Sequence, residues 1–231
     1  MRTLSPIKAI LLTACFVSLG TSGAITGTVK FEGKAPKLKE INMDKDAICK
    51  GKHTKPLISE ALVLGEGNTL ANVIVKVTST VKGKHAAPKT PVVLTQKGCQ
   101  YSPHVVGVMA NQEIEFLNPD GTMHNVHAMP KVNKGFNLSM PKFKKKAVKK
   151  FKKAEDAFAI KCDVHPWMKS YVQVFSHPYF SVSAKDGKYT IENLADGDYE
   201  IEAWHEKMGT QKAKVSVKDG KATSDFVFAR K

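Results

Sequence analysis

The segment Cys162-Asp-Val-His-Pro-Trp-Met168 holds the residues of this 231-residue chain whose types and spacing most clearly point to chemistry. It places a thiol, an imidazole and a thioether at intervals of three residues. Soft sulfur suits Cu(I), and imidazole nitrogen suits both Cu(I) and Cu(II). Two histidines and a cysteine with a weak axial methionine form the mononuclear type 1 copper centre of electron-transfer proteins. Because His124 offers the second histidine, we expect one copper ion bound by His124, Cys162, His165 and Met168.

Other metal sites fit this pattern less well. Zinc favours closed tetrahedral ligation, in which methionine is a poor ligand. Covalent haem attachment needs Cys-x-x-Cys-His, which does not occur. A binuclear copper centre needs a second cysteine in the loop, where residue 166 is proline. A cysteine buried in a metal-free core remains the alternative to copper.

The N-terminus indicates the compartment. Residues 1–24 carry Arg2 and Lys8, then a short apolar run, then small residues, which is the order of a secretory signal peptide. We expect a mature chain that begins near Ile25 in the periplasm. A lipobox-like stretch ends at Cys15, but we favour the signal peptide because the apolar run continues beyond that cysteine. No other segment is apolar for long enough to span a membrane.

Three cysteines then remain, Cys49, Cys99 and Cys162. In an oxidising compartment this number suggests one disulfide and one cysteine with another task. A Cys49–Cys99 disulfide would leave Cys162 for the metal. The alternative is a second Cys/His metal site, which would join Cys49 and Cys99 to His53 and His104. We prefer the disulfide.

The elements that must position these residues are predicted to be strands. Short β-branched runs separated by turn residues are typical of a β-sandwich. Such runs cover residues 25–31, 72–77, 91–95, 105–118, 157–162, 170–175, 181–183, 189–194, 199–205, 215–217 and 226–228. Asp-Gly pairs between the C-terminal runs predict a meander of consecutive strands. The fold class is therefore predicted to be all-β.

The stretch His124-Asn-Val-His127, followed by Cys-x-x-His-x-x-Met, resembles the cupredoxin (blue-copper) family of the amicyanin and plastocyanin type. The resemblance covers roughly Pro91 to Phe175 and implies a Greek-key β-sandwich with copper at one end. It implies that His124, Cys162 and His165 are equatorial copper ligands and that Met168 is the axial ligand. It also implies that His127 is not a ligand and that the backbone N–H of Asn125 tunes the cysteine sulfur.

The C-terminal part is similar to a different exported module. Its strand pattern resembles the carboxypeptidase regulatory-like (transthyretin-like) β modules, and it carries no catalytic set. At this size it is expected to pack against the copper domain. We thus predict a signal peptide over 1–24, a cupredoxin-like domain with an N-terminal β extension over 25–176, and a small β-sandwich-like module over 177–231.

Lysines dominate the charge of the chain, whose formal net charge is +15. Eight of them lie in Lys142–Lys153, where apolar residues recur at helical spacing. This segment is either a basic amphipathic helix or a loop that enters a strand near Phe151. Its lysines either keep an edge strand from pairing with another chain or steer the protein towards an acidic partner or an anionic surface.

These features predict an exported blue-copper protein that carries single electrons between periplasmic redox proteins and is not an enzyme. Its positive charge suits an acidic partner such as a cytochrome c, a dehydrogenase or an oxidase. Nothing points to nucleic acid as a partner. One alternative is a periplasmic copper-trafficking or storage protein. Another is a structural cell-surface β protein with a degenerate copper site.

Overall fold

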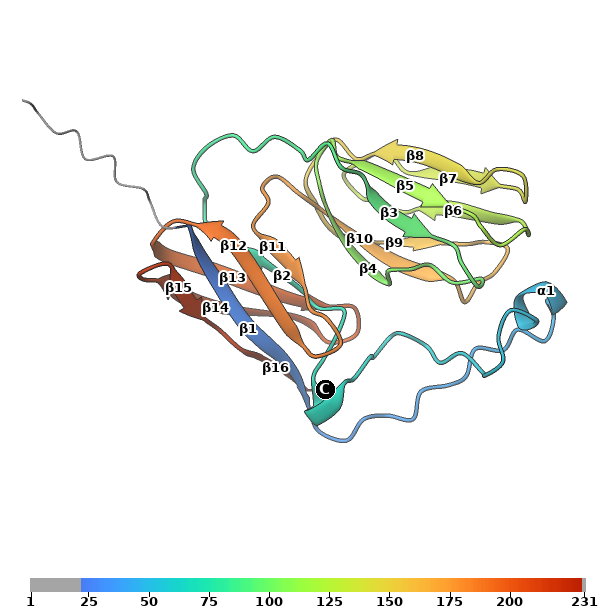
Figure 1. Ribbon diagram of the computed structural model, residues 1–231, viewed down its shortest axis with the longest axis horizontal. Coiled ribbons are helices and arrows are strands. Elements are labelled where there is room, and N and C mark those ends of the chain that lie inside the picture. The colour runs from blue at the N-terminus through green and yellow to red at the C-terminus, as the bar shows by residue number, and fades with distance from the viewer. Residues whose placement is uncertain (1–21, 230–231) are drawn as a thin grey trace, which may run out of the picture.

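The computed structural model describes residues 22–229, which are built almost entirely of strands (Figure 1). The predicted all-β class is therefore confirmed. Residues 1–21, which contain most of the predicted signal peptide and Cys15, lie outside the described part of the chain. Within the described residues, no helix has the length and apolar character needed to cross a membrane.

Two sheets between Val92 and Phe175 form the first sandwich. One has the strand order β4-β10-β9-β6-β7 and the other the order β3-β5-β8. The strands are β3 (Val92–Thr95), β4 (Val105–Met109), β5 (Glu113–Leu117), β6 (His124–Ala128), β7 (Phe136–Met140), β8 (Lys146–Lys150), β9 (Glu155–Lys161) and β10 (Lys169–Phe175). Ile114 and Phe116 alternate with glutamates along β5 and are fully buried in the core between the sheets. Many neighbouring strands are not consecutive in the chain, as a Greek-key sandwich requires.

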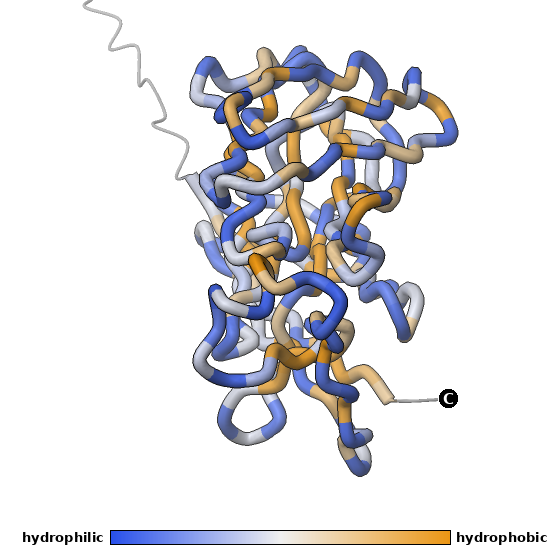
Figure 2. Tube along the Cα trace, turned by 90° about the vertical axis from the view of Figure 1, so that its right-hand side faces the viewer, coloured by the Kyte–Doolittle hydropathy of each residue, from blue (hydrophilic) through white to orange (hydrophobic). Residues whose placement is uncertain are grey.

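The remaining strands form a second sandwich beside the first. Its sheets have the orders β12-β1-β15, with β16 also paired to β1, and β11-β2-β13-β14. The strands are β1 (Gly23–Glu32), β2 (Ile74–Val77), β11 (Phe180–Val182), β12 (Lys188–Leu194), β13 (Gly197–His205), β14 (Gly209–Val217), β15 (Lys221–Thr223) and β16 (Phe226–Ala229). Hydrophobic residues run through the interior of both sandwiches, and hydrophilic residues fill many of the surface loops (Figure 2).

The strand pairing corrects the predicted grouping, in which the N-terminal strands extend the copper domain. β1 and β2 instead take central positions in the two sheets of the second sandwich. Val29 and Phe31 of β1 pack in one core with Phe226 and Phe228 of β16. The C-terminal strands need β1, because both β12 and β16 form their backbone hydrogen bonds with it.

The predicted C-terminal meander is also wrong. In the described ladders β11 pairs with β2, β12 pairs with β1, and β13 pairs with β2 and β14. The Asp-Gly connections therefore carry the chain from one sheet to the other. This arrangement buries both sheets against each other, whereas a single meander would leave one apolar face uncovered.

The two sandwiches meet at a small apolar junction. Ile74, Val105 and Phe175 are buried together there. The ring of Phe175 stacks on that of Phe180, with 3.9 Å between the ring centroids. As expected, the C-terminal strands pack against the strands of the first sandwich.

Residues 33–73, between β1 and β2, form a long excursion that we call the covering segment. It leaves the second sandwich, reaches the far end of the first and returns (Figure 1). It contains the short helix α1 (Ala47–Lys50) and the 3₁₀ turn η1 (Glu66–Asn68). A disulfide joins Cys49 of α1 to Cys99, which confirms the predicted bridge.

The lysine-rich segment 142–153 contains β8, so the helical interpretation is wrong. The strand begins at Lys146 and ends just before Phe151, whose side chain is buried in the first core. Within residues 22–229, β8 pairs with β5 alone and is an edge strand. Lysines at this edge disfavour pairing with another chain.

Candidate metal centre

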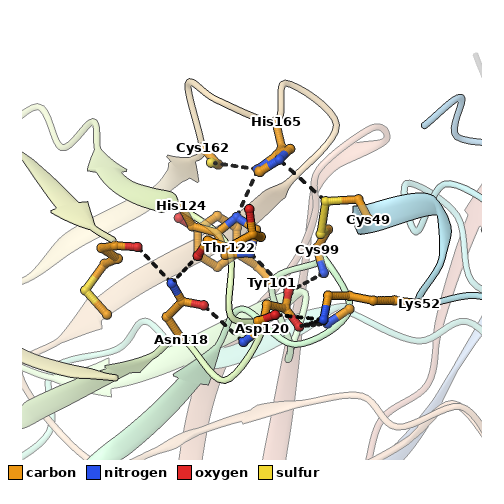
Figure 3. A network of polar contacts seen from close by, with 12 residues as sticks. Cys49, Lys52, Cys99, Tyr101, Asn118, Asp120, Thr122, His124, Cys162 and His165 are labelled. Atoms are coloured by element: carbon orange, nitrogen blue, oxygen red, sulfur yellow. Dashed lines mark hydrogen bonds and ion pairs between the residues drawn. A yellow bond between two sulfur atoms is a disulfide. The ribbon is translucent and has the colours of Figure 1, made fainter. Parts of the chain in front are cut away.

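His124, Cys162 and His165 come together at one end of the first sandwich (Figure 3). Their candidate ligand atoms all lie within 4.8 Å of one another. The Nδ1 atoms of the two histidines are 2.9 Å apart, and Cys162 Sγ is 3.7 Å from His165 Nδ1. The three residues are 0%, 1% and 2% exposed, so water has almost no access to this cluster.

The strand register explains why these residues meet. β6 and β9 are antiparallel neighbours with His127 opposite Lys161, so the start of β6 lies beside the end of β9. Asn125 then reaches Asp163: its Oδ1 accepts the Asp163 backbone N–H at 2.7 Å, and its Nδ2 donates to the Asp163 carboxylate at 2.9 Å. The Tyr101 hydroxyl donates to the Asn125 carbonyl at 2.6 Å. The loops that carry His124 and Cys162 are thus joined directly.

The loop after Cys162 is closed by its own backbone. The Met168 N–H donates to the His165 carbonyl at 2.8 Å, and the Cys162 N–H donates to the Met168 carbonyl at 3.2 Å. The Trp167 indole N–H donates to the Cys99 carbonyl at 3.0 Å. Met168 is 1% exposed and belongs to the first core. Three predicted ligands therefore share one cluster, and the fourth is buried in the same loop.

A carboxylate faces the second nitrogen of each histidine. Asp120 Oδ2 lies 3.0 Å from His124 Nε2, and Asp46 Oδ2 lies 2.9 Å from His165 Nε2. Burial raises the pKa of Asp120, but its hydrogen bonds with His124 and with backbone N–H groups hold that pKa well below its usual range. The Cys49 N–H and His165 lower the pKa of Asp46. Both carboxylates are therefore ionised at neutral pH.

Ionised carboxylates only accept hydrogen bonds, so Nε2 of each histidine must carry the hydrogen. In a neutral imidazole the other nitrogen, Nδ1, then holds a lone pair. The two Nδ1 lone pairs of His124 and His165 would face each other at 2.9 Å, an arrangement that needs a proton or a metal cation between them. Burial lowers the pKa of His124, but Asp120 and Cys162 outweigh burial and raise it. The donor set thus fits a soft or borderline cation.

Cys162 is the free cysteine of the described residues, and its surroundings favour the thiolate. Burial raises its pKa, but hydrogen bonds outweigh burial and lower the pKa from 9.0 to about 7. These bonds come from the His124 ring, the backbone N–H groups of Asn125 and His165, and the His165 ring. The thiolate is the metal-binding form of cysteine. The backbone N–H of Asn125 is one of the groups that lower this pKa.

Other histidines lie outside this cluster. His127 Nδ1 is 3.0 Å from Asp163. The alternative Cys/His site is not formed: Cys49 and Cys99 are bonded to each other, His53 Nε2 contacts the Gly98 carbonyl at 2.7 Å, and His104 pairs with a glutamate. The disulfide lies instead against the metal centre, with Cys49 Sγ 3.5 Å from His165 Nε2.

Sequence reasoning missed Asp46 and Asp120. The signal for Asp120 is its place four residues before His124, in the turn that leads into β6. Asp46 precedes Cys49 by three residues and caps α1, where its carboxylate accepts the Cys49 N–H. That spacing predicts a helix start, but nothing in it indicates that His165 lies nearby.

No family model and no curated protein matches this chain. Similar solved structures include the Cu-containing nitrite reductase NirK from Thermus scotoductus SA-01, which is 20% identical with a TM-score of 0.33 and aligns over 42% of this chain and 25% of its own. Amicyanin from Paracoccus versutus is 24% identical with a TM-score of 0.33, over 44% of this chain and 97% of its own. A Cu(I) form of an amicyanin mutant is 20% identical with a TM-score of 0.34, over 44% of this chain and 98% of its own. The chain thus spans a quarter of the nitrite reductase and nearly all of the amicyanins.

Proposed function

We propose that this chain is an exported blue-copper protein that carries single electrons between redox proteins outside the cytoplasm. His124, Cys162 and His165 would hold the metal, with Met168 as a weak axial ligand. The observation that carries the proposal is the convergence of two imidazole nitrogens and one low-pKa thiol in a buried cluster. When bound at such a donor set, copper supplies one-electron cycling between Cu(I) and Cu(II).

The contacts around the donors support electron transfer because they hold the ligands still. Each histidine is held by a carboxylate, and Asn125 and Tyr101 join the two ligand-bearing loops. A cluster held from outside keeps a similar arrangement in both oxidation states of its metal. The free energy of reorganisation on electron transfer is correspondingly small.

Burial of the donors favours an electron carrier over a copper-trafficking protein or an enzyme. A trafficking protein hands its metal over by ligand exchange, so a partner must reach at least one ligand. An enzyme needs an open position at the metal for its substrate. Here the covering segment lies over His165, which is 2% exposed. An electron can cross such a cover directly, whereas ligand exchange with a partner or entry of a substrate requires the covering segment to move.

The charge of the chain supports an acidic partner. Lysines outnumber acids along the β8 edge, although Lys146 and Lys150 are paired with Glu115 and Glu113 of β5. We propose that an acidic redox protein, such as a cytochrome c, a dehydrogenase or an oxidase, approaches this positively charged surface. Association should then slow as the salt concentration rises.

Titration of the metal-free protein with Cu(II) tests the proposal. One equivalent should produce intense visible absorption from charge transfer between the thiolate and copper. Cys162→Ser should abolish this absorption, whereas His127→Gln should retain it because His127 faces Asp163 outside the cluster. Colourless binding of Cu(I) alone would favour a trafficking protein, and no binding of either ion would contradict the proposal.

A further inference from the structure

We propose that Asp46 is a positioning residue for His165 and that the Cys49–Cys99 disulfide locks Asp46 in place, so that reduction of the bridge weakens metal binding. The inference deepens the proposed copper site and rests on it. It assigns the covering segment the role of a thiol-sensitive clamp on the metal centre.

Both oxygens of Asp46 are engaged. Oδ2 lies 2.9 Å from His165 Nε2, and Oδ1 accepts the Cys49 backbone N–H at 2.8 Å. One carboxylate therefore connects the metal ligand to the helix that carries the disulfide. A carboxylate on the second nitrogen of a ligating histidine fixes the ring orientation and raises the basicity of the ligating nitrogen.

The other end of the bridge reaches the second histidine in the same way. The Cys99 backbone N–H donates to Asp120 Oδ2 at 2.6 Å, and the same oxygen lies 3.0 Å from His124 Nε2. The disulfide thus links two carboxylates, each of which holds one histidine of the proposed site. Figure 3 shows the bridge together with Asp120, His124 and His165. Lys52, also in the covering segment, lies 3.4 Å from Asp120 Oδ1.

The bridge is the covalent tie between α1 and the first sandwich. A helix of four residues is not stable by itself, because the cost of nucleation exceeds the gain from one turn. Met43 is buried in the first core and His53 contacts the Gly98 carbonyl, so other contacts also hold the covering segment. The bridge adds a fixed point at Cys49, whose backbone N–H is the one that Asp46 accepts.

The switching step is thiol–disulfide exchange with a dithiol reductant, which reaches the buried sulfurs only when the covering segment opens locally. One thiolate of the dithiol attacks a sulfur of the bridge to form a mixed disulfide and release the other cysteine as a thiolate, which takes up a proton. The second thiol of the reductant then displaces the remaining cysteine. Two electrons and two protons pass to Cys49 and Cys99, and the dithiol is oxidised to a disulfide.

The first test compares Asp46→Asn with Asp44→Asn. Asp44 is the matched control, because it is 65% exposed and pairs with Lys50 of the same helix, away from His165. Cu(II) affinity is measured by competition with a chelator. Loss of a carboxylate partner of a ligating histidine typically costs about 10- to 100-fold in affinity. Asp46→Asn should show a loss of this size and a shifted visible band, and Asp44→Asn should show neither.

The second test removes the bridge with the double substitution Cys49→Ser and Cys99→Ser. Copper affinity should fall by a similar factor, about 10- to 100-fold. Adding Asp46→Asn to this variant should then cost little more, because both changes remove one contact. If this variant does not fold, the double substitution Cys49→Ala and Cys99→Ala, which buries no hydroxyl and frees no thiol, replaces it in the same competition.

The outcomes separate this inference from the proposed function. A wild-type protein with intense visible absorption whose affinity is unchanged by Asp46→Asn keeps the copper site and overturns the inference. Unchanged affinity after loss of the bridge overturns the lock. A wild-type protein that binds no copper refutes the proposed function, and the inference falls with it.

Discussion

Removal of the Cys49–Cys99 bridge from the metal-free protein should cost several kcal/mol of stability. The two cysteines are 50 residues apart in the sequence. The loop-closure entropy for this length is about 14 cal/mol/K, which is about 4 kcal/mol at 25 °C. Both sulfurs are fully buried in the first core, so the paired change Cys49→Ala and Cys99→Ala also loses packing. We therefore expect the free energy of unfolding to fall by at least about 4 kcal/mol.

Equilibrium unfolding in urea measures this change. Each sandwich holds one of the two tryptophans, so Trp204→Phe leaves Trp167 to report on the first sandwich. Cys162→Ala is the control for loss of a buried sulfur without loss of a bridge. The dependence of stability on urea should also steepen, because the unbridged chain exposes more surface when unfolded. A loss under about 1 kcal/mol with an unchanged slope would refute the loop-closure reasoning.

Three further predictions concern the junction, an acid and the thiol. Phe175→Ala should cost about 3–5 kcal/mol by calorimetry, because it empties the stack on Phe180. The metal-free protein should lose stability as pH falls below about 4, because the pKa of Asp120 is lower in the folded than in the unfolded state. Denaturation at several pH values should show that the stability of Asp120→Asn falls less with pH than that of the wild type. Ultraviolet absorption of the Cys162 thiolate in the metal-free protein should titrate near 7; a midpoint above 8.5 would contradict the hydrogen bonds assigned to that sulfur.

The core of the candidate site could be predicted from sequence because its chemistry is local. Cys162 and His165 share one loop, and donor type alone indicates a metal that accepts both sulfur and nitrogen. His124 could be chosen because it lies in the segment that follows the strand predicted to end near Asn118. The disulfide followed from counting three cysteines in an oxidising compartment.

Asp46 could not be predicted because its partner is distant in sequence. Asp46 and His165 are 119 residues apart, and only the tertiary fold brings them within 2.9 Å. The sequence near Asp46 shows a helix cap and nothing more. The sequence does not predict where the covering segment runs, so it gives no partner for His165 Nε2.

The grouping of strands failed for a similar reason. The periodicity of residues 25–31 predicts a strand but says nothing of its neighbour, and chain order suggested the adjacent copper domain. Val29 and Phe31 pack instead against Phe226 and Phe228, near the other end of the chain. The helical spacing of apolar residues in 142–153 also misled, because pairing of β8 with β5 overrides so short a periodic pattern.

X-ray absorption at the copper edge of the loaded protein identifies the atoms bound to the metal. We expect two imidazole nitrogens and one short sulfur contact, which disappears in Cys162→Ser. In His165→Ala we expect loss of one imidazole, with the sulfur retained. A first shell without sulfur, or one with two or more short sulfur contacts, would contradict a mononuclear centre held by His124, Cys162 and His165.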